Sequence, residues 1–274
     1  NPDQSIITQM ENIINNLIKE KKNLLNSVNI SIESFGPKYD CNICHDTGYY
    51  SENNRTIMCN CLKQKLLDIE YNQANMSNLK NQTFDNFNLA YYSDKPDKEK
   101  YHSDISPRDN ILMIKNVAIN FINNFDNPNE KNLLFSGNTG LGKTFLSSCI
   151  ANEILKKGKT VLYQTAPMML DNIIDFRFGK KTEVSNLYDT IINTDLLVID
   201  DLGTEYMNNI KFTELFNIIN TRILTSDKNT KTIISTNLNI NNLLSTYDER
   251  IMSRLIGSYN ICRFFGEDIR FKKI

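Results

Sequence analysis

The segment 137–144 reads GNTGLGKT and matches the full G-x-x-x-x-G-K-[ST] pattern of a phosphate-binding loop. In such a loop, backbone N–H groups surround the phosphates and the N-terminus of the following helix adds its positive end. Lys143 is expected to reach the outer phosphates, and the hydroxyl of Thr144 to bind magnesium. The sequence therefore predicts a site for a nucleoside triphosphate. The expected nucleotide contacts are Gly137, Asn138, Thr139, Gly140, Leu141, Gly142, Lys143, Thr144 and Phe145.

Two carboxylates and an amide follow apolar segments further along the chain. Residues 195–203 read DLLVIDDLG, which is typical of a strand that ends in a Walker B motif. Asp200 is expected to hold magnesium through its water shell, and Asp201 to orient and deprotonate the attacking water. Asn237 follows the apolar run 231–236 and would help to position the same water. The alternative is a strand end that carries two solvated aspartates.

Four of the six cysteines form two close pairs, which are Cys41 with Cys44 and Cys59 with Cys61. Between the pairs, residues 48–50 and 55–58 read as two short strands joined by a turn at 51–54. This is the layout of a zinc ribbon, in which four thiolates make a closed structural site. His45 is the substitute ligand if one cysteine fails to reach the metal. An iron–sulfur cluster and free or redox-active thiols are the alternatives.

Two arginines, Arg250 and Arg254, are four residues apart and therefore share one face of a predicted helix. They could form surface ion pairs with Glu249 or other acids. They could also reach a γ-phosphate across a subunit interface, where an arginine stabilises the transferred charge.

Alternating strand and helix patterns position these residues. Apolar, strand-like runs occur at 132–136, 160–165, 195–200, 231–236 and 259–265. Helical patterns occur at 111–125, 145–157, 167–177, 209–225 and 240–256. This alternation predicts an α/β fold, with a parallel sheet covered by helices on both faces. The loop 137–144 then lies at the carboxyl ends of the strands, where such sheets bind ligands.

The composition agrees with a packed globular protein, because 40% of the residues are hydrophobic. The formal net charge is −1, so any contact with nucleic acid must be local. No apolar run approaches the roughly 18 residues of a membrane span and no secretory signal is evident, so a cytoplasmic location without membrane contact is expected. Reduced cysteines are expected there, with Cys149 and Cys262 as small buried hydrophobic residues.

The N-terminal part has a different organisation. Residues 4–28 carry apolar side chains at helical spacing, and this helix would either pack on its own domain or bind a partner. A second helical stretch begins at Cys61 and runs roughly to Leu79. Residues 81–110 have a mixed and polar composition. The run of charged residues at 94–100 is most simply interpreted as a solvated linker or loop. We therefore predict two domains, an N-terminal domain at 1–80 with a zinc ribbon at 41–61, and a nucleotide-binding domain at 81–274.

Taken together, these motifs resemble the AAA+ ATPases of the DnaC/DnaI-type bacterial replicative helicase loaders, with the transposition helper IstB as a cousin. The resemblance covers roughly residues 81–274 and keeps the family's order of motifs. It rests on GNTGLGKT at 137–144, LLVIDDLG at 196–203, IISTNL at 233–238 and DERIMSRL at 248–255. Residues 83–87 look like the family's lead-in segment. The cysteine module looks like the helicase-binding domain of DnaI-type loaders, which IstB-like proteins lack.

The resemblance implies roles for particular residues. Asn237 becomes sensor 1, and Arg250 and Arg254 become an arginine finger and a sensor-like residue. Residues 167–188 take the place of a helix that lines a single-stranded DNA path. Its basic candidates are Arg177, Lys180 and Lys181, although an exposed charged helix end explains them equally well.

The resemblance also implies a fold and a function. The sequence ends about ten residues after its fifth strand, so we expect an AAA+ sheet without a full C-terminal lid. The adenine side should be more open, and hydrolysis should depend on a neighbouring subunit. The implied function is a slow ATPase, stimulated by DNA or a partner, that loads a DnaB-type hexameric helicase onto single-stranded DNA during replication initiation. Its cofactors would be ATP/ADP, Mg²⁺ and Zn²⁺, with head-to-tail self-association. A transposition helper and a non-hydrolysing scaffold are the alternatives.

Overall fold

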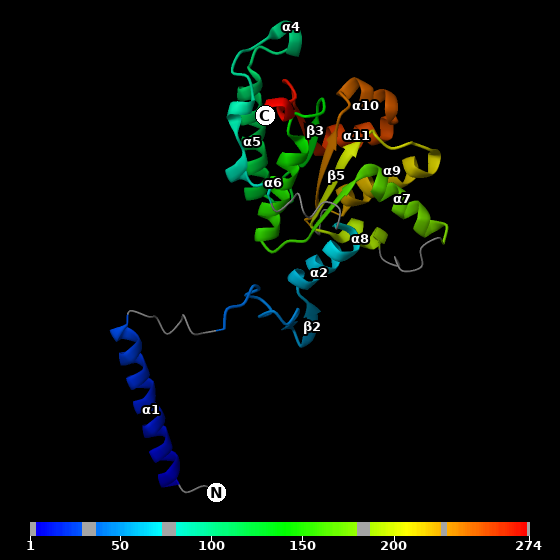
Figure 1. Ribbon diagram of the computed structural model, residues 1–274. Coiled ribbons are helices and arrows are strands. Elements are labelled where there is room, and N and C mark those ends of the chain that lie inside the picture. Colours follow the sequence, from blue (N-terminus) through cyan, green and yellow to red (C-terminus); the bar gives the residue numbers. More distant parts are fainter. Residues whose placement is uncertain (1–3, 29–36, 73–80, 180–186, 226–228, 273–274) are drawn as a thin grey trace.

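Five parallel strands form the central sheet in the order β4-β5-β6-β3-β7 (Figure 1). The computed structural model describes residues 4–28, 37–72, 81–179, 187–225 and 229–272. Every pairing between neighbouring strands of this sheet is parallel, as the alternating pattern predicts. The strands are β3 (Asn132–Ser136), β4 (Val161–Thr165), β5 (Leu196–Leu202), β6 (Lys231–Thr236) and β7 (Tyr259–Arg263).

Helices cover both faces of this sheet, because successive strand residues point to opposite sides and both sides are apolar. Leu133 and Phe135 face one core, whereas Leu134 faces the other. The first core also contains α5 (Pro107–Asn123) and α6 (Lys143–Lys156). The second core contains α7 (Ala166–Arg177), α8 (Leu187–Asn193), α9 (Asn209–Leu224), α10 (Ile240–Thr246) and α11 (Glu249–Ser258). The predicted fold class is therefore confirmed.

Two predicted helices have different bounds in the structure. The helix expected at 111–125 begins at Pro107, because Ser106 accepts a hydrogen bond from the N–H of Asp109 and proline is compatible with the first turn. The helix expected at 240–256 is broken into α10 and α11. Asp248 caps α11 by accepting from the N–H of Ile251, which interrupts the continuous helical pattern.

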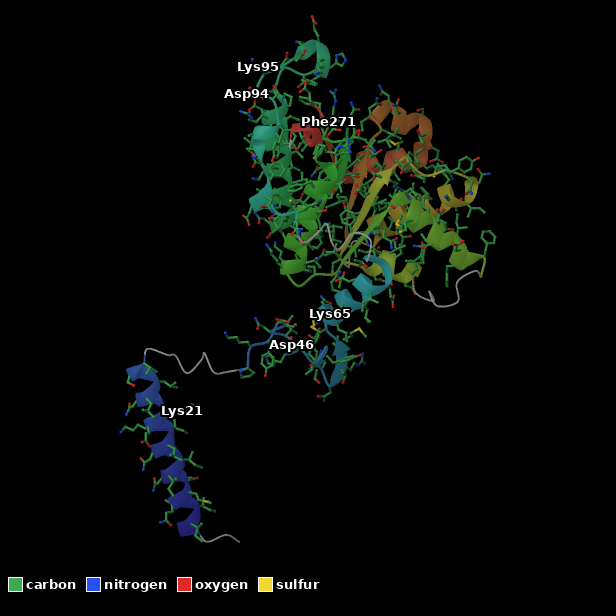
Figure 2. The ribbon with its side chains drawn as sticks, viewed as in Figure 1. Lys21, Asp46, Lys65, Asp94, Lys95 and Phe271 are labelled. Atoms are coloured by element: carbon green, nitrogen blue, oxygen red, sulfur yellow. The ribbon has the colours of Figure 1, made fainter. Side chains whose placement is uncertain are left out.

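The segment 81–110 is less of a solvated loop than the sequence predicts. It contains the short helices η3 (Phe84–Asn86), η4 (Leu89–Tyr91) and α4 (Lys98–Tyr101). Phe84 and Phe87 pack against the first core, and Tyr92 is buried within it. Asp94 and Lys95 are exposed, as expected for the charge run (Figure 2).

The cysteine region folds as the predicted hairpin followed by a helix. Strands β1 (Tyr49–Glu52) and β2 (Arg55–Met58) pair antiparallel around a turn in which Asn53 and Asn54 have positive φ. The next helix, α2 (Asn60–Leu67), passes into a π-helical turn, η2 (Asp68–Asn72). The helix that we expected to run to Leu79 therefore changes from α-helical to π-helical at Asp68. Residues 73–80 lie outside the described part of the chain.

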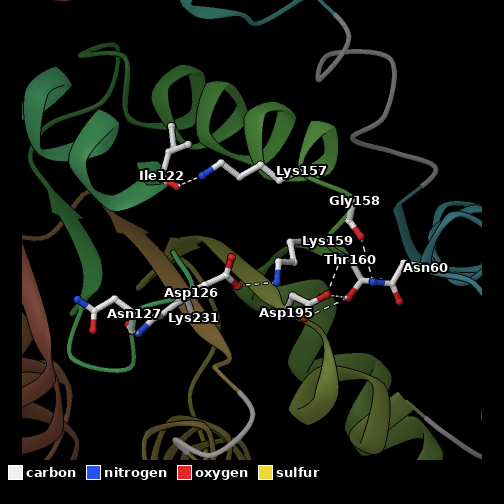
Figure 3. A network of polar contacts seen from close by, with 10 residues as sticks. All are labelled: Asn60, Ile122, Asp126, Asn127, Lys157, Gly158, Lys159, Thr160, Asp195 and Lys231. Atoms are coloured by element: carbon white, nitrogen blue, oxygen red, sulfur yellow. Dashed lines mark hydrogen bonds and ion pairs between the residues drawn. The ribbon is translucent and has the colours of Figure 1, made fainter. Parts of the chain in front are cut away.

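Helix α2 is attached to the edge strand β4. The amide of Gln64 accepts from the N–H of Val161 at 2.7 Å and donates to its carbonyl at 3.0 Å. Asn60 donates to the carbonyl of Gly158 at 3.0 Å, in the polar network of Figure 3. These bonds satisfy backbone groups that an edge strand otherwise leaves unpaired.

Helix α1 (Gln4–Ser27) keeps its apolar side chains exposed (Figure 2). Ile13 is 55% exposed and Leu17 is 59% exposed. Of the two alternatives from the sequence, packing on its own domain is therefore not observed. Among the helices of the described residues, none is long and apolar enough to cross a membrane.

A buried arginine joins α8, α9 and β6. The Arg222 guanidinium donates to the carbonyls of Ile191, Ile192, Thr194 and Lys231 and to the hydroxyl of Thr232, at 2.6–3.1 Å. Burial lowers its pKa to about 10, so it remains charged at neutral pH. Its five bonds tie the C-terminal end of α8 to the beginning of β6.

Replacing Arg222 by methionine is expected to lower the free energy of unfolding by about 3 kcal/mol, because buried carbonyls lose their donors. Urea unfolding at pH 7 measures this change. The control is Arg254→Met at an exposed position, which should change stability by less than about 0.5 kcal/mol. Equal unfolding midpoints for the two variants would contradict a stabilising role for Arg222.

Candidate nucleotide-binding site and cysteine cluster

The loop 137–144 joins β3 to α6 and depends on glycine at its ends. Gly137 and Gly142 have φ values of +148° and +91°. A Cβ atom at Gly137 would lie 2.2 Å from the carbonyl oxygen of Phe264, and one at Gly142 would lie 2.5 Å from the hydroxyl of Tyr92. Tyr92 also donates to the carbonyl of Leu141 at 3.0 Å. Tyr92, which follows η4, and Phe264, which follows β7, therefore support the loop.

Lys143 lies at the centre of this site and is 5% exposed. Its ammonium donates to the carbonyls of Gly137 and Asn138 at 2.6 and 2.7 Å and to Oδ1 of Asn237 at 2.8 Å. Burial lowers its pKa to about 8, against the opposing attraction of Asp201 and Asp200. The structure thus brings the loop lysine and the predicted amide together.

Asp200 is buried beside the loop and accepts hydrogen bonds at both carboxylate oxygens. Thr144 lies 3.4 Å from Oδ1, and Ser235 donates to that same oxygen. Tyr163 donates to Oδ2 at 2.9 Å. The pKa of Tyr163 lies well above its ordinary value, mainly because of burial and also because of Asp200, so the phenol keeps its proton.

Asp201 has a left-handed backbone, with φ +56°, at a register shift between β5 and β6. Strand β5 continues to Leu202, two residues beyond the predicted end at residue 200, so both aspartates lie within the strand. The N–H of Asp201 donates to Ser235 at 3.1 Å, and its carboxylate lies 3.4 Å from Nδ2 of Asn237. Burial and the neighbouring Asp200 raise its pKa. Lys143, Asp200, Asp201 and Asn237 thus form one connected cluster.

Residues after β7 contact the loop, which the sequence did not predict. The N–H of Ile269 donates to the carbonyl of Gly140 at 2.9 Å, and Arg270 pairs with Asp268 beside it. Ile269 also lines a small cavity with Tyr92 and Phe145. Residues 268–270 therefore form part of the surroundings of the loop. Their contacts with the loop join positions more than 120 residues apart, so no local pattern reveals them.

The four clustered cysteines converge as predicted. Their Sγ atoms all lie within 4.8 Å of one another, with Cys41–Cys59 at 3.7 Å and Cys44–Cys61 at 3.4 Å. Four sulfurs at about 2.3 Å from one zinc ion would be about 3.8 Å apart, so this donor set fits zinc. His45 is not a member of the cluster and lies against the ring of Tyr39. Hydrogen bonds from the backbone of Cys44 and Ile43 lower the pKa of Cys41 to about 6, which favours a thiolate.

Residues 57–273 match the profile of the family described as IstB-like ATP binding protein. The chain belongs to this family. The match begins in β2, upstream of the predicted boundary at residue 80, and covers the complete sheet.

Proteins that are similar to this chain support the resemblance to helicase loaders that its motifs show. The curated protein named replicative helicase loader DnaC of Escherichia coli K12 is 30% identical over 138 residues, which cover 50% of this chain and 55% of the relative. The chain therefore spans about half the length of that relative. Two solved structures share the fold. The first is a crystal structure of DnaI, with a TM-score of 0.53 and 20% identity, and the match covers 69% of this chain and 94% of that chain. The second is a crystal structure of the DnaC helicase loader, with a TM-score of 0.50 and 24% identity, and the match covers 65% of this chain and 96% of that chain.

Among the described residues, the three predicted arginines Arg177, Arg250 and Arg254 lie outside the cluster around Lys143. Arg250 is exposed on α11, where it pairs with Asp248 at 2.8 Å and lies over the ring of Phe216. Arg254 is exposed on the same helix. Arg177 ends α7 and pairs with the buried carboxylate of Glu214 at 2.8 Å. Lys180 and Lys181 lie outside the described residues.

Proposed function

We propose that this chain is an ATP-dependent loader that places a replicative hexameric helicase of the DnaB type on single-stranded DNA. The observation that carries the proposal is the presence, in one chain, of the cluster around Lys143 and a four-cysteine centre. The resemblance implies that the four-cysteine centre is a feature of DnaI-type loaders, whereas the transposition helper IstB shares only the nucleotide-binding part. The relative named replicative helicase loader DnaC supports the same assignment.

The nucleotide site would work as an ATPase through five side chains. Lys143 would bind the outer phosphates as a point charge, exchanging its present carbonyl partners for phosphate oxygens. Thr144 and Asp200 would hold Mg²⁺, which when bound draws charge from the phosphates. Asp201 would accept the proton of the attacking water, and Asn237, beside it, would orient that water.

Arg250 and Arg254 would complete this site on a neighbouring subunit. Both are exposed on α11, and neither makes a hydrogen bond or ion pair to the loop of its own chain within the described residues. A head-to-tail contact between two copies would place this face against the other copy's phosphates. ATP binding would then control assembly, and hydrolysis would release the loader.

The N-terminal part, residues 1–80, would bind the helicase, and residues 81–274 would carry the ATPase. The exposed apolar face of α1 provides a surface for such a partner. Single-stranded DNA would contact the end of α7, where Arg177 is still 52% exposed at its side chain while paired with Glu214, together with Lys180 and Lys181.

Raising the pH from 7.5 to 9 is expected to weaken ATP binding about tenfold. The pKa of Lys143 is lowered to about 8, so the charged form that attracts phosphate is lost as the pH rises through that value. Below pH 7.5 the affinity should be constant. A titration with a fluorescent ATP analogue measures the effect, and Lys156→Ala, at an exposed position of the same helix, should keep the inflection. A constant affinity between pH 7.5 and 9 for the unmodified protein would contradict the role of this ammonium.

Size-exclusion chromatography with the replicative helicase, with and without ATP, tests the loader function. Co-elution that changes with ATP is expected. A protein that elutes alone under both conditions, but binds duplex DNA or a recombinase, would favour the transposition helper. Helicase binding without any ATP turnover, even with single-stranded DNA present, would favour a scaffold.

A further inference from the structure

We propose that Tyr163 is a positioning residue for the ATPase reaction, acting through the carboxylate of Asp200. This inference rests on the proposed role of Asp200 in holding Mg²⁺. Tyr163 lies in β4, in the apolar core and far along the chain from every motif, and is 2% exposed. Its hydroxyl nevertheless donates to Oδ2 of Asp200 at 2.9 Å.

The strand order brings the tyrosine to the aspartate. Strand β4 pairs with β5 so that Tyr163 lies opposite Val198 and Thr165 lies opposite Asp200. Tyr163 therefore approaches Asp200 diagonally, on the face that packs against α6, and its long ring spans the distance. The same hydroxyl interacts with Ser148 of α6, one turn after Thr144. The phenol is thus held between the helix of the phosphate-binding loop and the strand of the aspartates.

The two donors to Asp200 divide its carboxylate oxygens between them. Tyr163 donates to Oδ2, whereas Ser235 donates to Oδ1, the oxygen that also faces Thr144. A carboxylate held at both oxygens cannot rotate about its side-chain bonds without breaking a buried hydrogen bond. Tyr163 therefore keeps Oδ1 directed toward the threonine hydroxyl, where the metal ligands must meet. Groups that orient a ligand in this way typically change metal affinity 10- to 100-fold when they are removed.

The experiment measures the Mg²⁺ dependence of nucleotide binding in Tyr163→Phe, using the fluorescence of a labelled ATP. The Mg²⁺ concentration at the midpoint is expected to rise about tenfold, while affinity for the nucleotide without metal stays unchanged. Excess Mg²⁺ should restore most of the ATP turnover. A defect of packing alone would not be recovered by metal.

Three further variants make the result decisive. Tyr259→Phe is the matched control, since this tyrosine is equally buried and the groups that act on its hydroxyl are Thr232 and Arg222, which lie outside the cluster around Lys143. It should titrate like the unmodified protein. Asp200→Asn should raise the midpoint more than Tyr163→Phe.

If Asp200→Asn raises the midpoint and Tyr163→Phe does not, the positioning role is wrong while the magnesium site stands. If neither variant raises it, the assignment of Asp200 to magnesium is wrong, and the inference about Tyr163 is overturned with it. Ser235→Ala, which removes the other donor, should shift the midpoint in the same direction as Tyr163→Phe and replaces it should that variant not fold.

Discussion

Lys143→Ala is expected to weaken ATP binding about 100-fold or more, which abolishes it under ordinary assay conditions. The ammonium is the buried cation of the phosphate-binding loop, and its two carbonyl contacts place it at the inner side of that loop. Burial already destabilises its charged form, as the lowered pKa of about 8 shows. Replacing Lys143 by alanine removes a buried charge that is costly to desolvate. We therefore expect the variant to stay folded while it loses ATP binding.

Calorimetric titration of ATP into the variant measures this loss, and circular dichroism checks the fold. The matched control is Lys156→Ala on the same helix, where the lysine is 64% exposed and pairs with Glu153. Exposed pairs of this kind contribute little, so binding should be unchanged. Normal ATP affinity in Lys143→Ala would show that the assigned site is wrong.

Removing zinc is expected to unfold the cysteine module and to release α2 from the sheet. Among the described residues 37–70, only Cys44, Gly48 and Cys59 are buried, so this region has almost no apolar core. A structural zinc site supplies about 10–16 kcal/mol of apparent binding free energy, which is folding free energy in such a module. Asn60 lies between two of the cysteines and Gln64 one turn later, so the contacts with Gly158 and Val161 depend on the same segment.

Hydrogen exchange with and without a strong zinc chelator measures this effect at the amide of Val161, whose acceptor is Gln64. Faster exchange of this amide and loss of helicase binding are expected together. Cys44→Ser should reproduce both effects, whereas Cys262→Ser, in β7, should retain the metal. Freshly purified protein that contains no zinc, or an unchanged Val161 amide after chelation, would refute the coupling.

Much of the fold follows from short-range patterns. All five strands of the sheet were predicted within three residues at each end, because each is a short apolar run bounded by polar residues. The exceptions have local causes that compete with periodicity. Asp248 caps a new helix inside a continuous helical pattern, and β5 continues through the left-handed Asp201 to Leu202. In the first case, one capping side chain interrupts the helical pattern. In the second case, a left-handed residue lies inside the strand without ending it.

The sequence predicted those residues of the candidate site that belong to a contiguous motif or stand at the end of an apolar run. Lys143, Asp200, Asp201 and Asn237 meet because parallel strands present their carboxyl ends at one edge of the sheet. Tyr163 and Ser235 were missed because they lie within apolar strands, where a hydroxyl gives no signal of its own. Arg177 was considered only for DNA, whereas the structure pairs it with Glu214.

By itself the amino-acid sequence determined the phosphate-binding loop, the hairpin with its four cysteines and the alternation of strands and helices. These features depend on residues close together in the chain, whose spacing sets backbone geometry directly. Only the tertiary structure decided that Tyr163 orients toward Asp200, that Gln64 covers the edge of β4 and that the segment after β7 contacts the loop. Those contacts depend on the strand order β4-β5-β6-β3-β7, which arises from packing of the whole chain and leaves no local periodicity.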